Sequence, residues 1–122
     1  MVAVIAGEPE RAEFTARLGT ATDLLWSAMS CWETVSALRN TYQLPVTLAR
    51  ERLDGFANAF SPITVVIGAR ELTAALDAYQ TYGKGRHRAK LNFGDCFAYA
   101  CAKTNGAQLL YKGDDFAHTD LA

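Results

Sequence analysis

The sequence has no long apolar run, and this absence limits the kinds of protein it can encode. Its apolar stretches are short, as in Val2–Ala6, whereas a helix that spans a bilayer needs about 20 consecutive apolar residues. The sequence therefore excludes a membrane-spanning helix. The amino end also has neither a basic leader nor a sufficiently long apolar stretch, which predicts that no signal peptide is present.

Cysteine, proline and net charge are also scarce. The chain has three cysteines, three prolines and a formal net charge of −1. The cysteines are odd in number, lack C-x-x-C spacing and sit in apolar patterns, so we expect reduced thiols in a cytoplasmic protein rather than disulfides or zinc ligands. The balanced charge excludes a uniformly basic nucleic-acid-binding surface but allows a local basic patch. A composition that is 50% apolar over 122 residues predicts a single globular domain, residues 1–122.

Apolar residues recur at helical spacing in several parts of the chain. The predicted helices span residues 8–18, 27–40, 45–60, 69–82 and 92–104. In the helix over 69–82 the spacing predicts a buried stripe of Leu72, Ala75, Leu76 and Tyr79. Four aromatic side chains on or beside such stripes are also expected in the core: Trp32, Phe93, Phe97 and Tyr99.

Short apolar segments between these helices predict strands at residues 24–26, 63–66 and 109–111. The segment 63–66 is rich in β-branched residues and apolar enough to be covered on both faces, which is typical of a strand inside a parallel sheet. Helices that alternate with such strands predict an α/β fold. We expect a three-layer α/β/α sandwich around a short parallel sheet.

Acidic residues lie at or soon after the ends of these predicted strands. Glu33 is in the helix that follows the first strand, Asp95 is in the first turn of the last helix, and Asp114 and Asp115 follow the last strand. Ligands of parallel sheets bind beyond the carboxyl ends of the strands. Carboxylates without matching Cys or His ligands suit Mg²⁺ or Mn²⁺, and this favours metal-assisted hydrolysis of a phosphodiester.

Each acid also has a structural interpretation. Ser30 and Glu33 have the spacing of a capping box, and Asp95 occupies the third position of a helix capped by Asn92, where a carboxylate favours the helix dipole. Gly-Asp-Asp is common in turns. Spacing alone leaves both interpretations open for these residues.

A basic loop precedes the last predicted helix. Four fixed positive charges occur within residues 84–90: Lys84, Arg86, Arg88 and Lys90. Such a loop could hold a nucleic-acid backbone beside an acidic metal site, or it could simply be a solvated loop.

Two blocks of the sequence resemble a known family. The segments L-N-F-G-D-C (91–96) and K-G-D-D-F-x-H-T-D (112–120), together with W-E-T at 32–34, resemble the PIN-domain toxins of bacterial toxin–antitoxin pairs, of the VapC type. The resemblance covers essentially the whole chain. It implies a PIN-like fold and a Mg²⁺-dependent endoribonuclease, usually a homodimer, that a cognate antitoxin inhibits by inserting a segment near the active site.

The same resemblance implies a set of site residues. Glu33, Asp95 and Asp115 match the metal-binding acids of the family, and Asp114 is a neighbouring acid in the same turn. Asp120 matches a supporting acid. The loop with Lys84, Arg86, Arg88 and Lys90 corresponds to the segment that leads to the third acid of the family, and we expect it to bind RNA.

One departure from the family pattern limits the expected activity. Family members begin with an apolar strand that ends in an Asp, inside a D-x-S-A-like motif, whereas Met1–Pro9 resembles the part that follows this motif. A site without this Asp should bind Mg²⁺ weakly. Either an upstream start restores the strand, or the chain is an interaction module that binds antitoxin or a second copy of itself without cleaving RNA.

Overall fold

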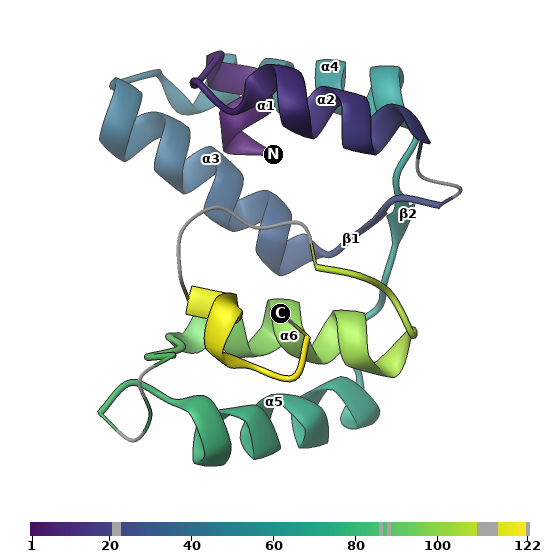
Figure 1. Ribbon diagram of the computed structural model, residues 1–122. Coiled ribbons are helices and arrows are strands. Elements are labelled where there is room, and N and C mark those ends of the chain that lie inside the picture. The colour runs from purple at the N-terminus through teal and green to yellow at the C-terminus, as the bar shows by residue number, and fades with distance from the viewer. Residues whose placement is uncertain (21–22, 86, 88, 110–114, 122) are drawn as a thin grey trace. The chain divides into compact units, whose positions relative to one another are not determined.

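The computed structural model describes residues 1–20, 23–85, 87, 89–109 and 115–121, with the backbone alone at 3, 20 and 115. The chain forms two compact units, Met1–Val65 and Val66–Ala122. Figure 1 shows the succession of their elements from the N-terminus to the C-terminus. Among the described residues, no helix combines the length and the apolar character needed to cross a bilayer.

The first unit contains four helices and two short strands within the described residues. Its elements are α1 (Val2–Ala6), α2 (Arg11–Thr20), β1 (Leu25–Trp26), α3 (Ala28–Tyr42), α4 (Val46–Phe60) and β2 (Ile63–Thr64). Helices α3 and α4 pack against each other, and α1 contacts α2, α3 and α4. The predicted helices over 8–18, 27–40 and 45–60 are therefore confirmed, with boundaries that shift by up to three residues.

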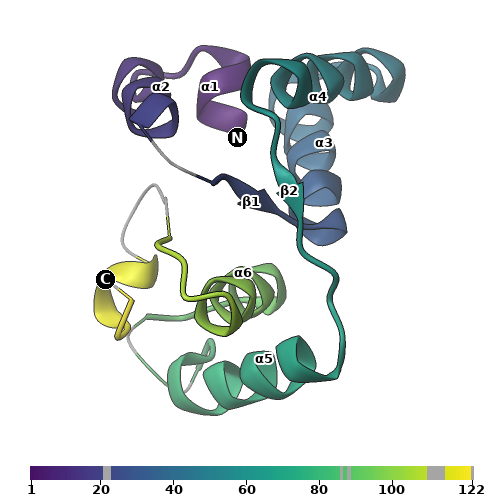
Figure 2. The same ribbon diagram turned by 90° about the vertical axis from the view of Figure 1, so that its right-hand side faces the viewer.

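The two strands are parallel and lie side by side, as Figure 2 shows. Leu25 pairs with Ile63, and the N–H of Ile63 donates to the carbonyl of Leu24 over 2.8 Å. Trp26 extends this pairing with its side chain, because its indole Nε1 donates to the hydroxyl of Thr64 over 3.0 Å. The same indole stacks on Phe56 of α4, with ring centroids 6.4 Å apart. These contacts tie the sheet to α4.

Two details of this unit correct the sequence predictions. The capping box of α3 uses Ser27 and Ser30, not Ser30 and Glu33, because the N–H of each serine donates to the hydroxyl of the other. The strand at 63–66 is not covered on both faces, since Ile63 is 51% exposed. The sheet that the described residues form has only two strands, so few neighbouring side chains are available to cover its apolar positions.

The second unit is built on a pair of packed helices, α5 (Ala69–Tyr82) and α6 (Phe93–Thr104), followed by a short 3₁₀ turn, Asp115–His118. Both ribbon views show α5 and α6 side by side. Both helices confirm the predicted ranges. Their buried cluster comprises Ala75, Ala78, Ala89, Leu91, Cys96, Tyr99, Ala100 and Phe116.

The buried face of α5 agrees with the predicted stripe only at Ala75. Leu72, Leu76 and Tyr79 are about half exposed, whereas Glu71, Ala75 and Ala78 are buried. Small alanine side chains let the two helix backbones approach closely, and this close packing takes precedence over the larger apolar residues on the neighbouring face. The carboxylate of Glu71 is used locally, because it accepts the N–H of Gly68 at the start of α5 over 2.9 Å.

The predicted aromatic core is confirmed in part. Tyr99 is buried and Phe97 is half buried, but Trp32 and Phe93 are 75% and 71% exposed. The α/β class with a short parallel sheet is confirmed, whereas Leu109, the first residue of the third predicted strand, lies in no strand. Residues 110 and 111 of that predicted strand are outside the described residues.

The three cysteines all lie among the described residues, and none of them forms a disulfide. Cys96 is buried, and Cys31 and Cys101 are half buried. Burial raises the pKa of the Cys96 thiol above its usual value, and the neighbouring charge of Asp95 raises it further. A thiol with a raised pKa is a poor nucleophile at neutral pH, so the structure gives Cys96 a packing role.

Candidate active site

Asp95 lies in the first turn of α6, where the backbone fixes its position. Its N–H donates to the side-chain oxygen of Asn92 over 2.9 Å, and its carboxylate Oδ2 accepts the N–H of Asn92 over 3.1 Å. This reciprocal pair is the capping box of α6. The structural interpretation of Asp95 is thus confirmed. It is compatible with a second role, because the carboxylate is only partly buried.

The C-terminal segment packs onto α6 through Phe116. Phe116 is 7% exposed and belongs to the same buried cluster as Cys96. Asp115, which precedes Phe116, begins the short 3₁₀ turn, but its side chain is outside the described part of the structure, as is all of Asp114. Asp95 immediately precedes Cys96, and Asp115 immediately precedes Phe116. Cys96 and Phe116 are buried in the same cluster.

Asp120 is the centre of a hydrogen-bonded group at the end of this segment. Its Oδ1 accepts the hydroxyl of Tyr99 over 2.5 Å and the hydroxyl of Tyr82 over 3.4 Å. Its other oxygen, Oδ2, pairs with the ammonium of Lys103. We call these four residues the Asp120 cluster: Tyr82, Tyr99, Lys103 and Asp120. The cluster joins α5, α6 and the C-terminal segment.

The electrostatics of the Asp120 cluster follow from these contacts. The hydrogen bond from Lys103 lowers the pKa of the Asp120 carboxyl below its usual value, and the hydrogen bond from Tyr99 lowers it further. Burial raises the pKa of the Tyr99 phenol above its usual value, and its hydrogen bond to Asp120 adds to this effect. Tyr99 therefore remains a protonated donor, and Asp120 a charged acceptor, across the neutral range.

The two contacts of Asp120 differ in strength. The side chains of Lys103 and Asp120 are 49% and 43% exposed, and such surface ion pairs contribute only about 0–1 kcal/mol to stability. Tyr99 is buried, and a buried donor that loses its acceptor costs about 1–3 kcal/mol. The hydrogen bond from Tyr99 is therefore the stronger of the two contacts of Asp120.

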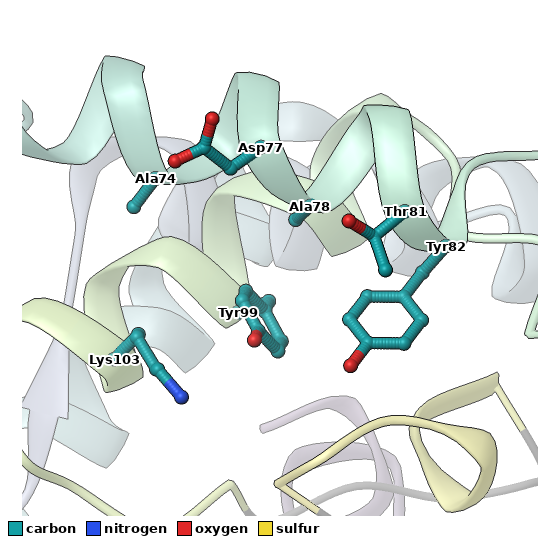
Figure 3. Close-up of a pocket in the computed structure, with 7 residues that line it drawn as sticks. All are labelled: Ala74, Asp77, Ala78, Thr81, Tyr82, Tyr99 and Lys103. Atoms are coloured by element: carbon teal, nitrogen blue, oxygen red, sulfur yellow. The ribbon is translucent and has the colours of Figure 1, made fainter.

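A small cavity opens between α5 and α6 beside this cluster. Its volume is about 170 Å³, and it is lined by Ala74, Asp77, Ala78, Thr81, Tyr82, Tyr99 and Lys103. Figure 3 shows the hydroxyl ends of Tyr82 and Tyr99 and the ammonium of Lys103 extending toward the same side of the helix pair. All three of these polar ends have a partner in Asp120.

The basic loop is held at its base by backbone hydrogen bonds. The N–H of Lys84 donates to the carbonyl of Leu91 over 3.0 Å, and the N–H of Leu91 donates to the carbonyl of Tyr82 over 2.9 Å. Ala89 and Leu91 are buried, whereas Lys84 and Lys90 are exposed. The loop therefore presents at least two of its cations to solvent from a fixed base, and Arg86 and Arg88 lie outside the described residues.

His87 has a structural role within this loop. Its Nδ1 accepts the N–H of Ala89 over 3.0 Å, and its ring packs edge-on against Tyr82 with centroids 5.1 Å apart. These contacts hold His87 against Ala89 and Tyr82.

Glu33 lies on α3 in the first unit, and its side chain is exposed. Asp95, Asp115 and Asp120 all belong to the second unit. Within the part of the chain that the structure describes, no three side chains of His, Cys, Asp or Glu form a group that could hold a metal ion. Convergence of the three acids therefore stays a prediction.

Sequence reasoning missed Tyr82, Tyr99 and Lys103 as possible site residues. One signal was available, because Asp95, Tyr99 and Lys103 are spaced four residues apart and so share one face of α6. The apolar ring of Tyr99 predicts only a place in the core. The partner of its hydroxyl, Asp120, is 21 residues away and could not be identified from spacing.

The chain is similar in sequence to a known domain family and to several ribonucleases. The family model of the PIN domain matches residues 1–121. Ribonuclease VapC30 of Mycobacterium tuberculosis is 40% identical over 122 residues, which is all of this chain and 91% of that protein. Ribonuclease VapC of Mycolicibacterium smegmatis is 37% identical over 122 residues and is covered to 92%. A VapC ribonuclease of Rhizobium meliloti is 40% identical over 133 residues, spanning 99% of this chain and 94% of that protein.

Proposed function

The chain belongs to the PIN-domain family, and from this premise we propose that it is a Mg²⁺-dependent endoribonuclease, the toxin of a toxin–antitoxin pair. Its relatives at 37–40% identity over their nearly full length are named as VapC ribonucleases, which supports RNA as the substrate. Glu33, Asp95 and Asp115 are the proposed metal ligands. Asp114 is the neighbouring acid in the same turn, and Asp120 supports the site.

One observation carries this proposal furthest. Asp95 precedes Cys96 and Asp115 precedes Phe116, and both following residues are buried in a single cluster. The backbones of Asp95 and Asp115 are thus both attached to the buried cluster of the second unit. This supports a shared role for two carboxylates that are 20 residues apart in the sequence.

The chemistry of these residues fits a hard divalent cation. Asp95 and Asp115 offer only carboxylate oxygens, and the sole described cysteine beside them, Cys96, is buried with a raised pKa. Oxygen donors favour Mg²⁺ or Mn²⁺ over zinc. When bound, such an ion activates water for attack on a phosphodiester and offsets negative charge on the phosphate.

The basic loop is the proposed contact for the RNA backbone. Lys84 and Lys90 are exposed on a loop whose base is fixed, and Arg86 and Arg88 belong to the same segment. Cations of this kind attract phosphates without reading base sequence. The loop leads directly into Asn92 and Asp95, so RNA held on it would lie next to the proposed acids.

The proposed partners follow from the family. We expect a cognate antitoxin that inhibits cleavage, a homodimer as the working form and a cytoplasmic location. A pull-down of the chain with the product of an adjacent antitoxin reading frame tests the first of these expectations, and sedimentation tests the second. An inactive antitoxin complex that regains cleavage when the antitoxin is degraded would support the inhibitory role.

The decisive experiment is RNA cleavage by the purified chain with Mg²⁺, compared with the variants Asp95→Asn and Asp115→Asn. Asp54→Asn is the matched control, because Asp54 is an exposed carboxylate on α4. We expect cleavage that EDTA abolishes, that Mn²⁺ restores, and that only the first two variants lose. Equal, EDTA-insensitive results from all four proteins would overturn the proposal and favour the alternative, an interaction module without catalysis.

A further inference from the structure

We infer that Tyr99, Lys103 and Asp120 are positioning residues, which hold the Asp115-bearing turn beside the face of α6 that carries Asp95. This inference rests on the proposed function. It concerns side chains that are not themselves proposed to touch the metal or the RNA.

The first step is the face of α6. Asp95, Tyr99 and Lys103 are four residues apart, so their side chains form one row along the helix. Tyr99 is buried at the middle of this row, and its ring packs against Tyr82 of α5 with centroids 5.7 Å apart. The row is therefore anchored against α5 and has little freedom to rotate.

The second step is the attachment of the C-terminal segment to this row. Asp120 accepts the hydroxyl of Tyr99 over 2.5 Å and pairs with Lys103. The segment is thus bound at the C-terminal end of a row whose N-terminal member is Asp95.

The third step is the rigidity of the segment between Phe116 and Asp120. The N–H and the hydroxyl of Thr119 both donate to the carbonyl of Phe116, over 3.1 and 2.8 Å, and Thr119 is buried. Phe116 itself is fixed in the core. These bonds connect Phe116, which follows Asp115, to Thr119, which precedes Asp120.

These steps have a consequence for the metal site. If Asp120 loses the hydrogen bond from Tyr99, the turn keeps its anchor at Phe116, but its second point of attachment is weakened to the surface ion pair with Lys103. The backbone at Asp115 is then held less firmly against α6. Outer groups that orient metal ligands typically affect metal affinity by about 10–100-fold. The affinity of the folded protein for a divalent ion should therefore depend on Tyr99 and Asp120.

The test measures Mn²⁺ affinity by titration calorimetry at a temperature where all variants are folded. The variants are Tyr99→Phe, Asp120→Ala and Asp120→Asn, and Tyr79→Phe is the control because Tyr79 lies on the outer face of α5. We expect Mn²⁺ affinity to fall about tenfold in Tyr99→Phe and Asp120→Ala. Asp120→Asn keeps an acceptor for Tyr99, so its Mn²⁺ affinity should fall less. The Mn²⁺ affinity of the control should be unchanged.

Hydrogen exchange without metal provides a second readout. Peptides that cover residues 115–121 should exchange faster in Tyr99→Phe and Asp120→Ala than in the parent chain, while α3 and α4 remain unchanged. Parent-like Mn²⁺ affinity and exchange in these variants would overturn the inference and leave the nuclease proposal standing. If the parent chain binds no Mn²⁺, the proposed metal site is wrong. In that case the hydrogen-exchange rates alone test whether Tyr99 and Asp120 hold the turn.

Discussion

Asn92 and Asp95 cap the last helix by exchanging hydrogen bonds, with each side chain accepting the N–H of the other residue over 3.1 and 2.9 Å. A proposed metal ligand is thereby fixed by the same bonds that begin its helix. The arrangement places the carboxylate in the first turn of the helix, where an acidic side chain stabilises the helix through its dipole. The structural and catalytic roles of Asp95 can be separated by the choice of substitution.

Asp95→Asn and Asp95→Ala should differ in stability but not in activity. Asparagine retains an oxygen that can accept the N–H of Asn92. The Asp95→Asn protein should therefore unfold at nearly the same urea concentration as the parent chain. Alanine removes this acceptor, and loss of a cap typically costs about 1 kcal/mol. RNA cleavage should be abolished in both. Urea titrations followed by circular dichroism, together with cleavage assays, test this, and an active Asp95→Asn protein would exclude Asp95 as a ligand.

Asp120 should make stability depend on pH. Its pKa is lowered in the folded chain by Lys103 and then by Tyr99, so its contribution is fully present above its unfolded pKa and is lost as the pH falls through the lower folded value. The difference in unfolding free energy between the parent chain and Asp120→Asn should therefore be largest near neutral pH and should shrink below about pH 4. Urea titrations at several pH values measure it. A difference that grows in acid would contradict the assigned contacts.

Two glycines should respond to alanine in opposite directions. A Cβ at Gly83 would lie 2.2 Å from the carbonyl oxygen of Tyr79, so Gly83→Ala must displace the end of α5 and should destabilise by about 1–3 kcal/mol. At Gly55, in α4, no atom lies within 4 Å of the added Cβ, and alanine there should stabilise by about 0.5–1 kcal/mol. Thermal unfolding of both variants checks the sign of each effect.

Leu91 should be a major contributor to the stability of the second unit. Its side chain is fully buried, between the basic loop and α6, and Leu→Ala changes at such sites cost about 2–5 kcal/mol. Leu76→Ala is the control, because Leu76 is 57% exposed on α5 and should change stability little. Equal effects of the two substitutions on urea unfolding would show that the second unit packs differently from the arrangement described.

Helix positions were predictable from the sequence, whereas helix faces were predictable only in part. The range 69–82 matches α5 because Gly68 and Gly83 flank an uninterrupted periodic segment. The same segment offers two apolar faces, one with Leu72 and Leu76 and one with alanines. Which face is buried depends on how α6 packs against α5. This is a tertiary effect, and it cannot be predicted from the periodicity of the sequence.

The candidate site divides in the same way. Asp95 was predictable, because a cap residue and an acid three positions later have a local signature. Its neighbours in the Asp120 cluster were not, because the bond between Tyr99 and Asp120 depends on the path of the C-terminal segment. Convergence of Glu33 with Asp95 and Asp115 stays a prediction, since it relates two units of the chain that are each described separately.

The division of the chain into two units has a practical result for spectroscopy. Both tryptophans, Trp26 and Trp32, belong to Met1–Val65, and four of the five tyrosines, at 79, 82, 99 and 111, belong to the remainder. Indole emission during unfolding therefore originates in the first segment alone, from β1 and α3. Phenol absorbance reports mainly the other segment, so disagreement between the two optical signals would reveal that the halves melt independently.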